Sequence, residues 1–344
     1  MKKLFTLLAL TITFSMNAQI STINTNNSGD YATAIGVSTT ASGEHSTAMG
    51  YYTLASGYAS TAMGNTTYAT ALSSTAMGIA TEASGNGSTA MGWQTKAAGN
   101  RSTAMGYQSE AQGLNSIAMG YLTIASGEQS TAMGESTIAS GYTATAMGRS
   151  STAIGTASAA MGAQTTASDY GSLVIGQYNS AGSSVTTDLQ SLMFNTENTA
   201  FVIGNGTGEN GRTDAFVVMF NGDATLAGNL SVNSDARLKS NIVSLGSTMS
   251  KLLEVDGKSY IMKRDEKKEP KIGLLAQDIE KVFPELVSES NGIKSVNYQG
   301  LVPVLINALK EQDVKMKEQQ MEIESLRYQE KRIDRLEKLI AQLD

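Results

Sequence analysis

The chain has 344 residues, with 25 Lys and Arg against 31 Asp and Glu, one His and no Cys. The lack of cysteine excludes disulfides, thiolate metal sites, a cysteine nucleophile and a lipoprotein anchor. The single histidine, His45, lies inside a sequence repeat, which argues against a Ser-His-Asp triad. No cofactor or metal is therefore expected.

Charge divides the chain into two unlike parts. Residues 20–230 contain four basic and twelve acidic residues and no proline, whereas residues 231–344 contain nineteen of each charge and all three prolines. Neither part has the basic stripe that neutralises phosphates, so nucleic acid is not an expected partner.

The first residues have the three regions of a secretory signal peptide. Lys2 and Lys3 precede the apolar run Leu4–Phe14, and small and polar residues follow up to Ala18. We expect residues 1–18 to be a cleaved leader and the protein to be secreted, at a cell surface or extracellular. No later apolar run approaches the length that spans a bilayer, so no transmembrane anchor is expected in the chain.

A 14-residue repeat follows. Its first glycine recurs without a slip, at Gly36, Gly50, Gly64, Gly78, Gly92, Gly106, Gly120, Gly134 and Gly148, and Gly162 and Gly176 keep the phase. A second glycine recurs half a period later and is replaced by Ala71 in one copy and by Asp169 in another. Such a period predicts one narrow coil of a parallel β-solenoid.

Each coil is expected to hold two short strands with a turn after each, such as Ser46–Met49 and Tyr52–Ala55. A helix is disfavoured because each glycine costs about 1 kcal/mol relative to alanine and no 3.6-residue apolar stripe is present. Ten periods at about 4.8 Å each give a rod of about 50 Å. The absence of proline in residues 20–230 agrees with a backbone that bonds to the coils above and below.

Equivalent side chains then form ladders. The column of Met49 and that of Thr47 are expected to share a face, because the two residues are two positions apart in a strand. One coil cannot bury enough apolar surface to offset the entropy of ordering it. We therefore expect three rods to pack their ladders around a common axis.

The repeat Ser-Thr-Ala-Met-Gly-x-x-Ser/Thr-x-Ala-Ser-Gly resembles the head repeat of YadA-like trimeric autotransporter adhesins over about residues 30–180. The resemblance implies a left-handed parallel β-roll that assembles as a homotrimer on a cell surface. Residues 19–180 are assigned to this head. Residues 181–230 are expected to be a β-rich neck, with strands at Ser191–Phe194, Ala200–Ile203 and Ala215–Phe220 and a hairpin turn within Gly204–Arg212. That loop lacks the Gly-Lys-Ser/Thr ending of a phosphate-binding loop, so nucleotide binding is not expected.

The segment Ser234–Ile242 (Ser-Asp-Ala-Arg-Leu-Lys-Ser-Asn-Ile) resembles the opening of the peptidase S74 family, the intramolecular chaperone of phage tail spikes and fibres. Ile272–Val287 and Val296–Leu305 agree with it, so the resemblance covers about residues 231–320. It implies that Ser234 is the nucleophile, that Lys239 is the base, and that the bond between Asn233 and Ser234 is cut.

The chemistry requires a neutral lysine. A serine hydroxyl becomes a good nucleophile when a neighbouring base takes its proton, and a lysine can do this if it is desolvated or lies near another cation. Arg237 is a candidate cation, and Asn233, Asp235 and Arg237 are treated as flanking or supporting residues. A degenerate domain that chaperones without cutting is the alternative.

The rest of this part predicts a mixed domain over residues 231–310. We expect strands at Lys258–Lys263 and Ile272–Leu275, the charged loop Arg264–Lys271, a helix at Ala276–Phe283 stopped by Pro284, and a strand after the Asn291-Gly292 turn. A long helix should begin near Leu301. Its apolar residues approximate heptads, so residues 311–344 are expected to form a helical bundle or trimeric coiled coil.

The sequence thus predicts a homotrimeric surface fibre whose C-terminal domain guides assembly and then removes itself in a single-turnover cleavage, with no activity on other substrates. A ligand on a host surface, matrix or glycan stays unspecified. The alternative is an ice-binding or carbohydrate-binding solenoid that uses the Thr ladder, with a trimerisation domain that does not cut. A glycan-degrading enzyme is disfavoured because the acidic residues of residues 20–230 are not paired.

Overall fold

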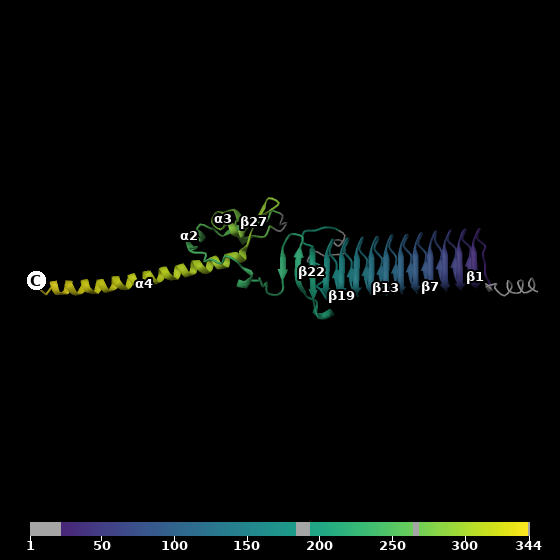
Figure 1. Cartoon of the computed structure of the whole chain (residues 1–344), viewed down its shortest axis with the longest axis horizontal. Helices are drawn as coiled ribbons and strands as arrows, with labels where there is room; N and C mark the ends of the chain where they lie inside the picture. Colours follow the sequence, from purple (N-terminus) through teal and green to yellow (C-terminus); the bar gives the residue numbers. More distant parts are fainter. Residues whose placement is uncertain (1–21, 184–192, 264–267, 343–344) are drawn as a thin grey trace, which may run out of the picture. The chain divides into compact units, whose positions relative to one another are not determined.

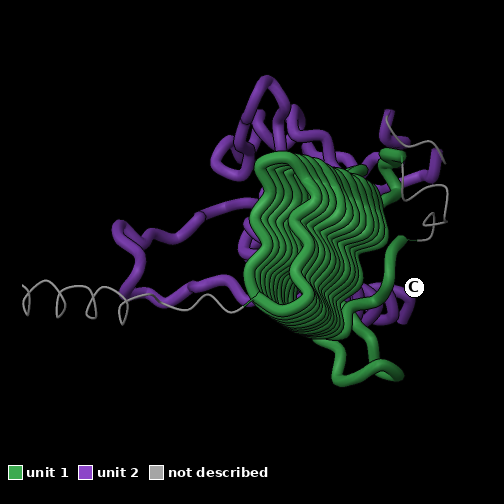
Figure 2. Tube along the Cα trace, turned by 90° about the vertical axis from the view of Figure 1, so that its right-hand side faces the viewer, with its two compact units in different colours: residues 1–230 green, residues 231–344 purple. Residues whose placement is uncertain are grey.

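A computed structural model describes residues 22–183, 193–263 and 268–342. The predicted leader lies outside the described residues. The chain divides into two compact units, with the boundary between Leu230 and Ser231, shown in two colours in Figure 2. Within the described residues, no helix combines the length and apolar character needed to cross a bilayer.

The first unit is a parallel β-solenoid, which confirms the predicted fold. Figure 1 shows its strands side by side along the stack, and in Figure 2 successive coils superimpose. From β1 to β20, each coil supplies one strand to each of two sheets. The longer strands are β1 (Thr33–Val37), β3 (Thr47–Tyr51), β5 (Thr61–Asn65), β7 (Thr75–Ile79), β9 (Thr89–Trp93), β11 (Thr103–Tyr107), β13 (Ile117–Tyr121), β15 (Thr131–Glu135), β17 (Thr145–Arg149), β19 (Ala159–Ala163) and β21 (Leu173–Gln177).

The second sheet consists of two-residue strands: β2 (Thr40–Ala41), β4 (Leu54–Ala55), β6 (Tyr68–Ala69), β8 (Glu82–Ala83), β10 (Lys96–Ala97), β12 (Glu110–Ala111), β14 (Ile124–Ala125), β16 (Ile138–Ala139), β18 (Thr152–Ala153) and β20 (Thr166–Ala167). Each strand pairs in parallel with the equivalent strand of the neighbouring coil. Residues one repeat apart therefore lie side by side, as Met49 and Met63 do. Backbone bonds between coils, such as that from the Thr47 N–H to the Ser60 carbonyl at 2.9 Å, use the donors that proline lacks.

The first repeat glycine lies inside the long strand, and the prediction that the strand stops before it is wrong. Gly50 has φ +124° within β3, and a Cβ built on it would stand 2.0 Å from the carbonyl oxygen of Gly64. Only glycine adopts this conformation without strain, and only its missing side chain lets the neighbouring coil approach so closely. The glycine ladder therefore sets the spacing and register of the solenoid.

The interior of the solenoid is lined by small side chains. Ala48 and Ala55 are fully buried, and so are their equivalents from Ala62 to Ala160 and from Ala41 to Ala167. Two columns of hydroxyl residues, beginning at Thr39 and Ser46, are also buried. Met49 and Thr47 lie on the outer face of the long strand and are half-buried in the single chain. The expected sharing of one face by the Met and Thr ladders is confirmed.

The end of the solenoid departs from the predicted neck. Strand β22 (Thr199–Asn205) pairs in parallel with β21 and places Gly204 beside Gly176, so it continues the longer sheet. Strands β23 (Asp214–Met219) and β24 (Ala224–Leu226) follow as antiparallel neighbours. The predicted hairpin between β22 and β23 is confirmed and contains the 3-10 turn η2 (Glu209–Gly211), although Gly204 belongs to β22. Of the predicted strand Ser191–Phe194, residues 191 and 192 lie outside the described residues and Met193 and Phe194 form no strand.

The buried carboxylate of Asp169 anchors the start of strand β22. Asp169 occupies the position of the second repeat glycine, and its carboxylate accepts hydrogen bonds from the Thr199 N–H at 2.8 Å and from the Thr199 hydroxyl at 2.7 Å. The Asn198 amide donates a third at 3.2 Å, and Ser183 donates from its N–H and its hydroxyl. Asp169, the exception to the repeat, thus fixes the point at which the chain returns to the solenoid as strand β22.

The second unit is a small mixed domain. It contains η3 (Ala236–Leu238), α2 (Met249–Leu252), β25 (Lys258–Tyr260), β26 (Lys271–Gly273), α3 (Ala276–Val282), η4 (Pro284–Leu286), β27 (Val287–Ser290), β28 (Ile293–Val296), η5 (Tyr298–Gly300) and α4 (Leu301–Ile340). The strand predicted at Lys258–Lys263 ends at Tyr260, and that predicted at Ile272–Leu275 runs from Lys271 to Gly273. Residues 264–267 of the predicted charged loop lie outside the described residues.

The core of this unit is small. Ile279 and Phe283 of the α3 region pack with Leu301 and Val304 of α4, and partly buried Leu252 of α2 joins them. The hairpin β27–β28 turns at Asn291 and Gly292, both at positive φ, as the Asn-Gly pair predicts. Helix α4 begins at the predicted residue and is the longest element of the domain.

Candidate active site

The residues predicted to carry the cleavage lie on a short exposed segment at the start of the second unit. Asp235 caps the 3-10 turn η3, because its carboxylate accepts the Arg237 N–H at 2.9 Å. The turn closes with the Lys239 N–H bonded to the Ala236 carbonyl at 3.1 Å. A 3-10 turn is compact, so it brings side chains on either side of it within reach of one another.

The turn brings together the two residues predicted to react. The Lys239 Nζ donates a hydrogen bond to the Ser234 Oγ at 2.7 Å. This places the candidate base in direct contact with the candidate nucleophile, at a distance suited to proton transfer. Both residues are exposed in the single chain, as is Asn233 on the other side of the predicted cleavage point.

Arg237 is engaged with Asp235. Its guanidinium forms an ion pair with the Asp235 carboxylate, with Nη2 at 2.6 Å from Oδ2 and Nε at 3.1 Å from Oδ1. Hydrogen bonds from the Arg237 side chain, and then from its backbone, lower the pKa of Asp235, and the same contact raises the pKa of Arg237. The charge of Arg237 is therefore directed at Asp235, and the pair reinforces the turn that holds Ser234 and Lys239.

Desolvation of the lysine is the condition that the single chain does not meet. An ammonium group in water stays protonated near neutral pH, and burial is what makes its neutral form accessible. Lys239 lies in an exposed segment, and residues 231–247 are exposed throughout. The single chain therefore shows the contact with Ser234 but no apolar surroundings around Lys239.

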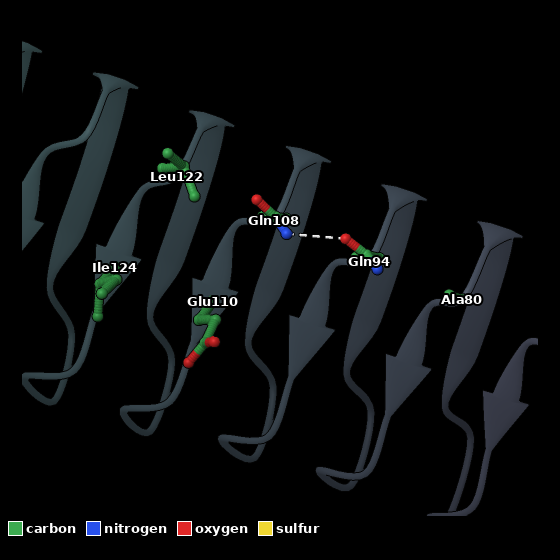
Figure 3. Close-up of a pocket in the computed structure, with 6 residues that line it drawn as sticks. All are labelled: Ala80, Gln94, Gln108, Glu110, Leu122 and Ile124. Carbon is green, nitrogen blue, oxygen red and sulfur yellow. Dashed lines mark hydrogen bonds between the residues drawn. The ribbon is translucent and has the colours of Figure 1, made fainter.

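The solenoid offers a second, weaker candidate, a shallow groove on its outside (Figure 3). Gln94 and Gln108 lie in one file at the edge of the coils with Ala80 and Leu122, while Glu110 and Ile124 lie on the short strands. Gln108 donates to Gln94 at 2.8 Å, and the Glu110 carboxylate accepts from Gln112 at 2.6 Å. Gln94 and Gln108 already pair with each other and Glu110 pairs with Gln112, so the groove is a surface feature and not a built site.

Comparison with known proteins covers both units. Residues 234–288 match the Peptidase_S74 family, described as the chaperone of endosialidase. The YadA head domain repeat matches residues 28–53, 55–81, 83–109, 111–134, 132–158 and 153–179. The chain is also 30% identical over 97 residues to the long tail fiber protein Gp37 of Escherichia phage AR1. That match covers 26% of this chain and 9% of the phage protein.

The order of the matches follows the order of the structural units, with the repeats on the solenoid and the chaperone family beginning at Ser234. The chain is thus built from YadA head repeats followed by a C-terminal chaperone-of-endosialidase domain of the Peptidase_S74 family.

Proposed function

We propose that the chain is a secreted, homotrimeric, adhesin-like or tail-fibre-like surface fibre whose C-terminal domain guides assembly and then cuts itself away. The observation that carries the proposal is the 2.7 Å hydrogen bond between Lys239 and Ser234. It lies at the first residue of the match to a chaperone family, shortly after the end of the solenoid unit. The domain boundaries at 18, 180, 230 and 310 are part of this proposal.

Trimer formation is supported by what the solenoid leaves exposed. Its interior holds only small side chains, while the Met ladder lies half-buried on the outside of the longer sheet. Packing three such ladders together removes apolar surface from water at about 25 cal/mol per Å². Helix α4 adds a second apolar stripe, with Leu309, Met316, Ile323, Leu326, Ile333 and Leu336 all exposed in the single chain.

The proposed cleavage uses only groups of this chain and water. Lys239 in its neutral form takes the proton of the Ser234 hydroxyl, and the oxygen attacks the carbonyl carbon of Asn233. The bond from this carbon to the Ser234 nitrogen breaks, the nitrogen takes the proton, and an ester forms. Water then hydrolyses the ester, leaving a carboxylate on Asn233 and a free amino group and hydroxyl on Ser234. If the carbonyl belongs to another chain, the nitrogen that leaves and takes the proton is that of the other chain's Ser234, and water again hydrolyses the ester on the attacking serine.

A chaperone at this end has a physical purpose. Pairing between coils requires each strand to find its neighbour in register, and unpaired sheet edges favour aggregation while this proceeds. A domain that first gathers three chains limits those errors. Removal of the domain afterwards makes assembly irreversible, since the cut fibre no longer carries the element that brought the chains together.

The alternative use of the Thr ladder keeps one supporting observation, the outward direction of the Thr47 column in the single chain. A flat hydroxyl surface for ice or sugar requires that column to remain exposed in the assembled protein. Met49 lies on the same face two residues away, and this apolar neighbour favours burial against other copies. Ice recrystallisation inhibition by the assembled protein would support the alternative.

Mass measurement tests the proposal. The full chain without residues 1–18 is expected to yield two species on denaturing mass spectrometry, one ending at Asn233 and one beginning at Ser234. Native mass spectrometry of the longer species should give three copies. A monomeric rod at micromolar concentration, or a chain that remains whole after trimers have formed, contradicts the corresponding half of the proposal.

A further inference from the structure

A single carboxylate on helix α4 holds the segment that precedes helix α2. Glu311 Oε1 accepts the N–H groups of Thr248, at 2.5 Å, and of Met249, at 3.3 Å, and also contacts the Thr248 hydroxyl at 3.3 Å. Glu311 Oε2 accepts the Ser247 hydroxyl at 2.6 Å. These contacts join residues more than sixty positions apart in the chain.

Two further contacts from α4 hold the same segment. The Thr248 hydroxyl donates to the Val304 carbonyl at 3.1 Å, and the Asn307 amide donates to the Gly246 carbonyl at 3.4 Å. Val304, Asn307 and Glu311 lie three and four positions apart, so they form one stripe along the helix. We call the contact between this stripe and residues 246–249 the latch.

In both segments that form it, the latch lies at the boundary between exposed and buried residues. Along α4, Glu311 is the last residue that is not exposed, and residues 312–342 are all exposed. Along the other segment, residues 231–247 are exposed and Thr248 is the first buried residue, with 2% of its surface accessible. The latch is therefore the point where the exposed segment carrying Ser234 and Lys239 joins the folded domain.

We infer that Glu311 is a positioning residue for the proposed cleavage, which ties the segment carrying Ser234 and Lys239 to helix α4. The inference rests on the proposed function. Because α4 also carries the exposed apolar stripe expected to bring chains together, the latch links the place of the reacting residues to the assembly of that helix. Cleavage then depends on assembly because the helix that assembles also holds the reacting segment.

A carboxylate suits this role because it accepts several hydrogen bonds at once. Three donors bond to it in the latch, the Ser247 hydroxyl and the N–H groups of Thr248 and Met249. Charge-assisted bonds of this kind are about twice as strong as neutral ones. The hydrogen bonds from Ser247 and from the Thr248 N–H lower the pKa of Glu311, so the group is charged at neutral pH. A charged acceptor also satisfies the N–H groups that open helix α2.

Variants of the full chain without residues 1–18 test the latch. In Glu311→Ala the cleavage rate should fall about tenfold or more, which corresponds to about 1.4 kcal/mol or more in activation free energy. Glu311→Gln keeps one acceptor oxygen and should give an intermediate rate. Glu322→Ala removes an exposed carboxylate further along the same helix and should cleave at the rate of the unchanged chain.

A second measurement separates the latch from the chemistry. In a Ser234→Ala chain, amide hydrogen exchange at Thr248 and Met249 should be slow, and adding Glu311→Ala should accelerate it while native mass still gives trimers. If the unchanged chain never cleaves, the proposed function fails but this exchange measurement still decides the latch. Cleavage at the unchanged rate in Glu311→Ala, or exchange unaffected by that substitution, overturns the inference.

Discussion

The ammonium of Lys239 donates a 2.7 Å hydrogen bond to the hydroxyl of Ser234, and both side chains are exposed in the single chain. A lysine in this position has the right partner but not the dry surroundings that a base requires. The two facts together predict that cleavage needs assembled chains, because only further protein surface can exclude water from the contact.

The first prediction is the dependence of cleavage on assembly and on these two side chains. Ser234→Ala should remain whole and still trimerise. Lys239→Arg should also remain whole, because a guanidinium stays protonated and cannot act as a base. In the unchanged chain, the rate measured by mass spectrometry should be independent of dilution once trimers exist. Cleavage of Lys239→Arg at the unchanged rate, or a new N-terminus at another residue, would show that these residues do not carry the reaction.

The second prediction concerns the Met ladder. Met91→Asp places a carboxylate in the middle of the ladder, and in a trimer the charge occurs three times around the axis. Burying unpaired charges costs several kcal/mol each, so trimer yield and melting temperature should both fall. The substitution Glu135→Asp, at an exposed position of the same sheet, is the matched control and should change neither. Normal assembly of Met91→Asp would mean that the ladder faces water.

The third prediction tests the glycine ladder. Gly92 has φ +126°, and a Cβ there would stand 2.0 Å from the Gly106 carbonyl oxygen, so Gly92→Ala should lower the melting temperature strongly. Strained backbone alone costs about 1–3 kcal/mol per position. Gly87→Asn is the control, because Gly87 has φ +63° and its nearest neighbour, the Arg101 Cγ, is 3.6 Å away. Asparagine tolerates this conformation, so its melting temperature should stay near that of the unchanged chain.

The solenoid could be predicted because its signal is repeated. A period of 14 residues fixes which side chains stack, and alternation then places Met49 and Thr47 on one face. The buried hydroxyl columns that begin at Thr39 and Ser46 could not be predicted the same way, since hydrophobic patterning assigns polar side chains to the surface. The coil is too narrow for large side chains, so its interior holds small ones, and these include the hydroxyl side chains of Ser and Thr.

Features that depend on contacts between residues far apart in the chain could not be predicted from the sequence. Glu311 resembles any other acidic residue of a charged helix until its partners near Thr248 are known. Asp169 is visible in the sequence only as an exception to the repeat. The return of the glycine phase from Gly176 to Gly204, two periods later, was a signal that could have placed β22 in the stack. The Ser234–Lys239 contact followed from a family resemblance, and no spacing rule would have selected that pair.

The fourth prediction is that the exception at Asp169 stabilises the end of the solenoid. Asp169→Gly restores the repeat glycine but leaves the Thr199 N–H and hydroxyl without their acceptor, and each buried unsatisfied group costs about 1–3 kcal/mol. Hydrogen exchange at Thr199 should accelerate strongly. Ala71→Gly restores the repeat glycine at the other exception, and it should leave hydrogen exchange at Thr199 unchanged. Equal behaviour of the two variants would mean that the Asp169 contacts do not hold β22.

The last prediction is the response of the latch to pH. The pKa of Glu311 lies below its ordinary value of 4.5, because its neutral neighbours donate hydrogen bonds to the charged form. A carboxyl whose pKa is lowered by folding contributes stability that is fully present above the unfolded pKa and is lost as pH falls through the folded one. The latch should therefore be unchanged between pH 7 and about 5 and should open only below about 4.5.

The charged side chains nearest the latch are Lys251 on α2, Glu254 just after α2, and Lys310, Asp313 and Lys315 on α4, and none of them is a cause of the lowered pKa of Glu311. Hydrogen exchange at Thr248, corrected for the intrinsic effect of pH and measured in the Ser234→Ala chain, reports the opening. In Glu311→Gln the same amide should exchange faster at neutral pH and lose the acid-dependent step, because the amide side chain does not titrate. A step that persists in Glu311→Gln would assign the titration to another group.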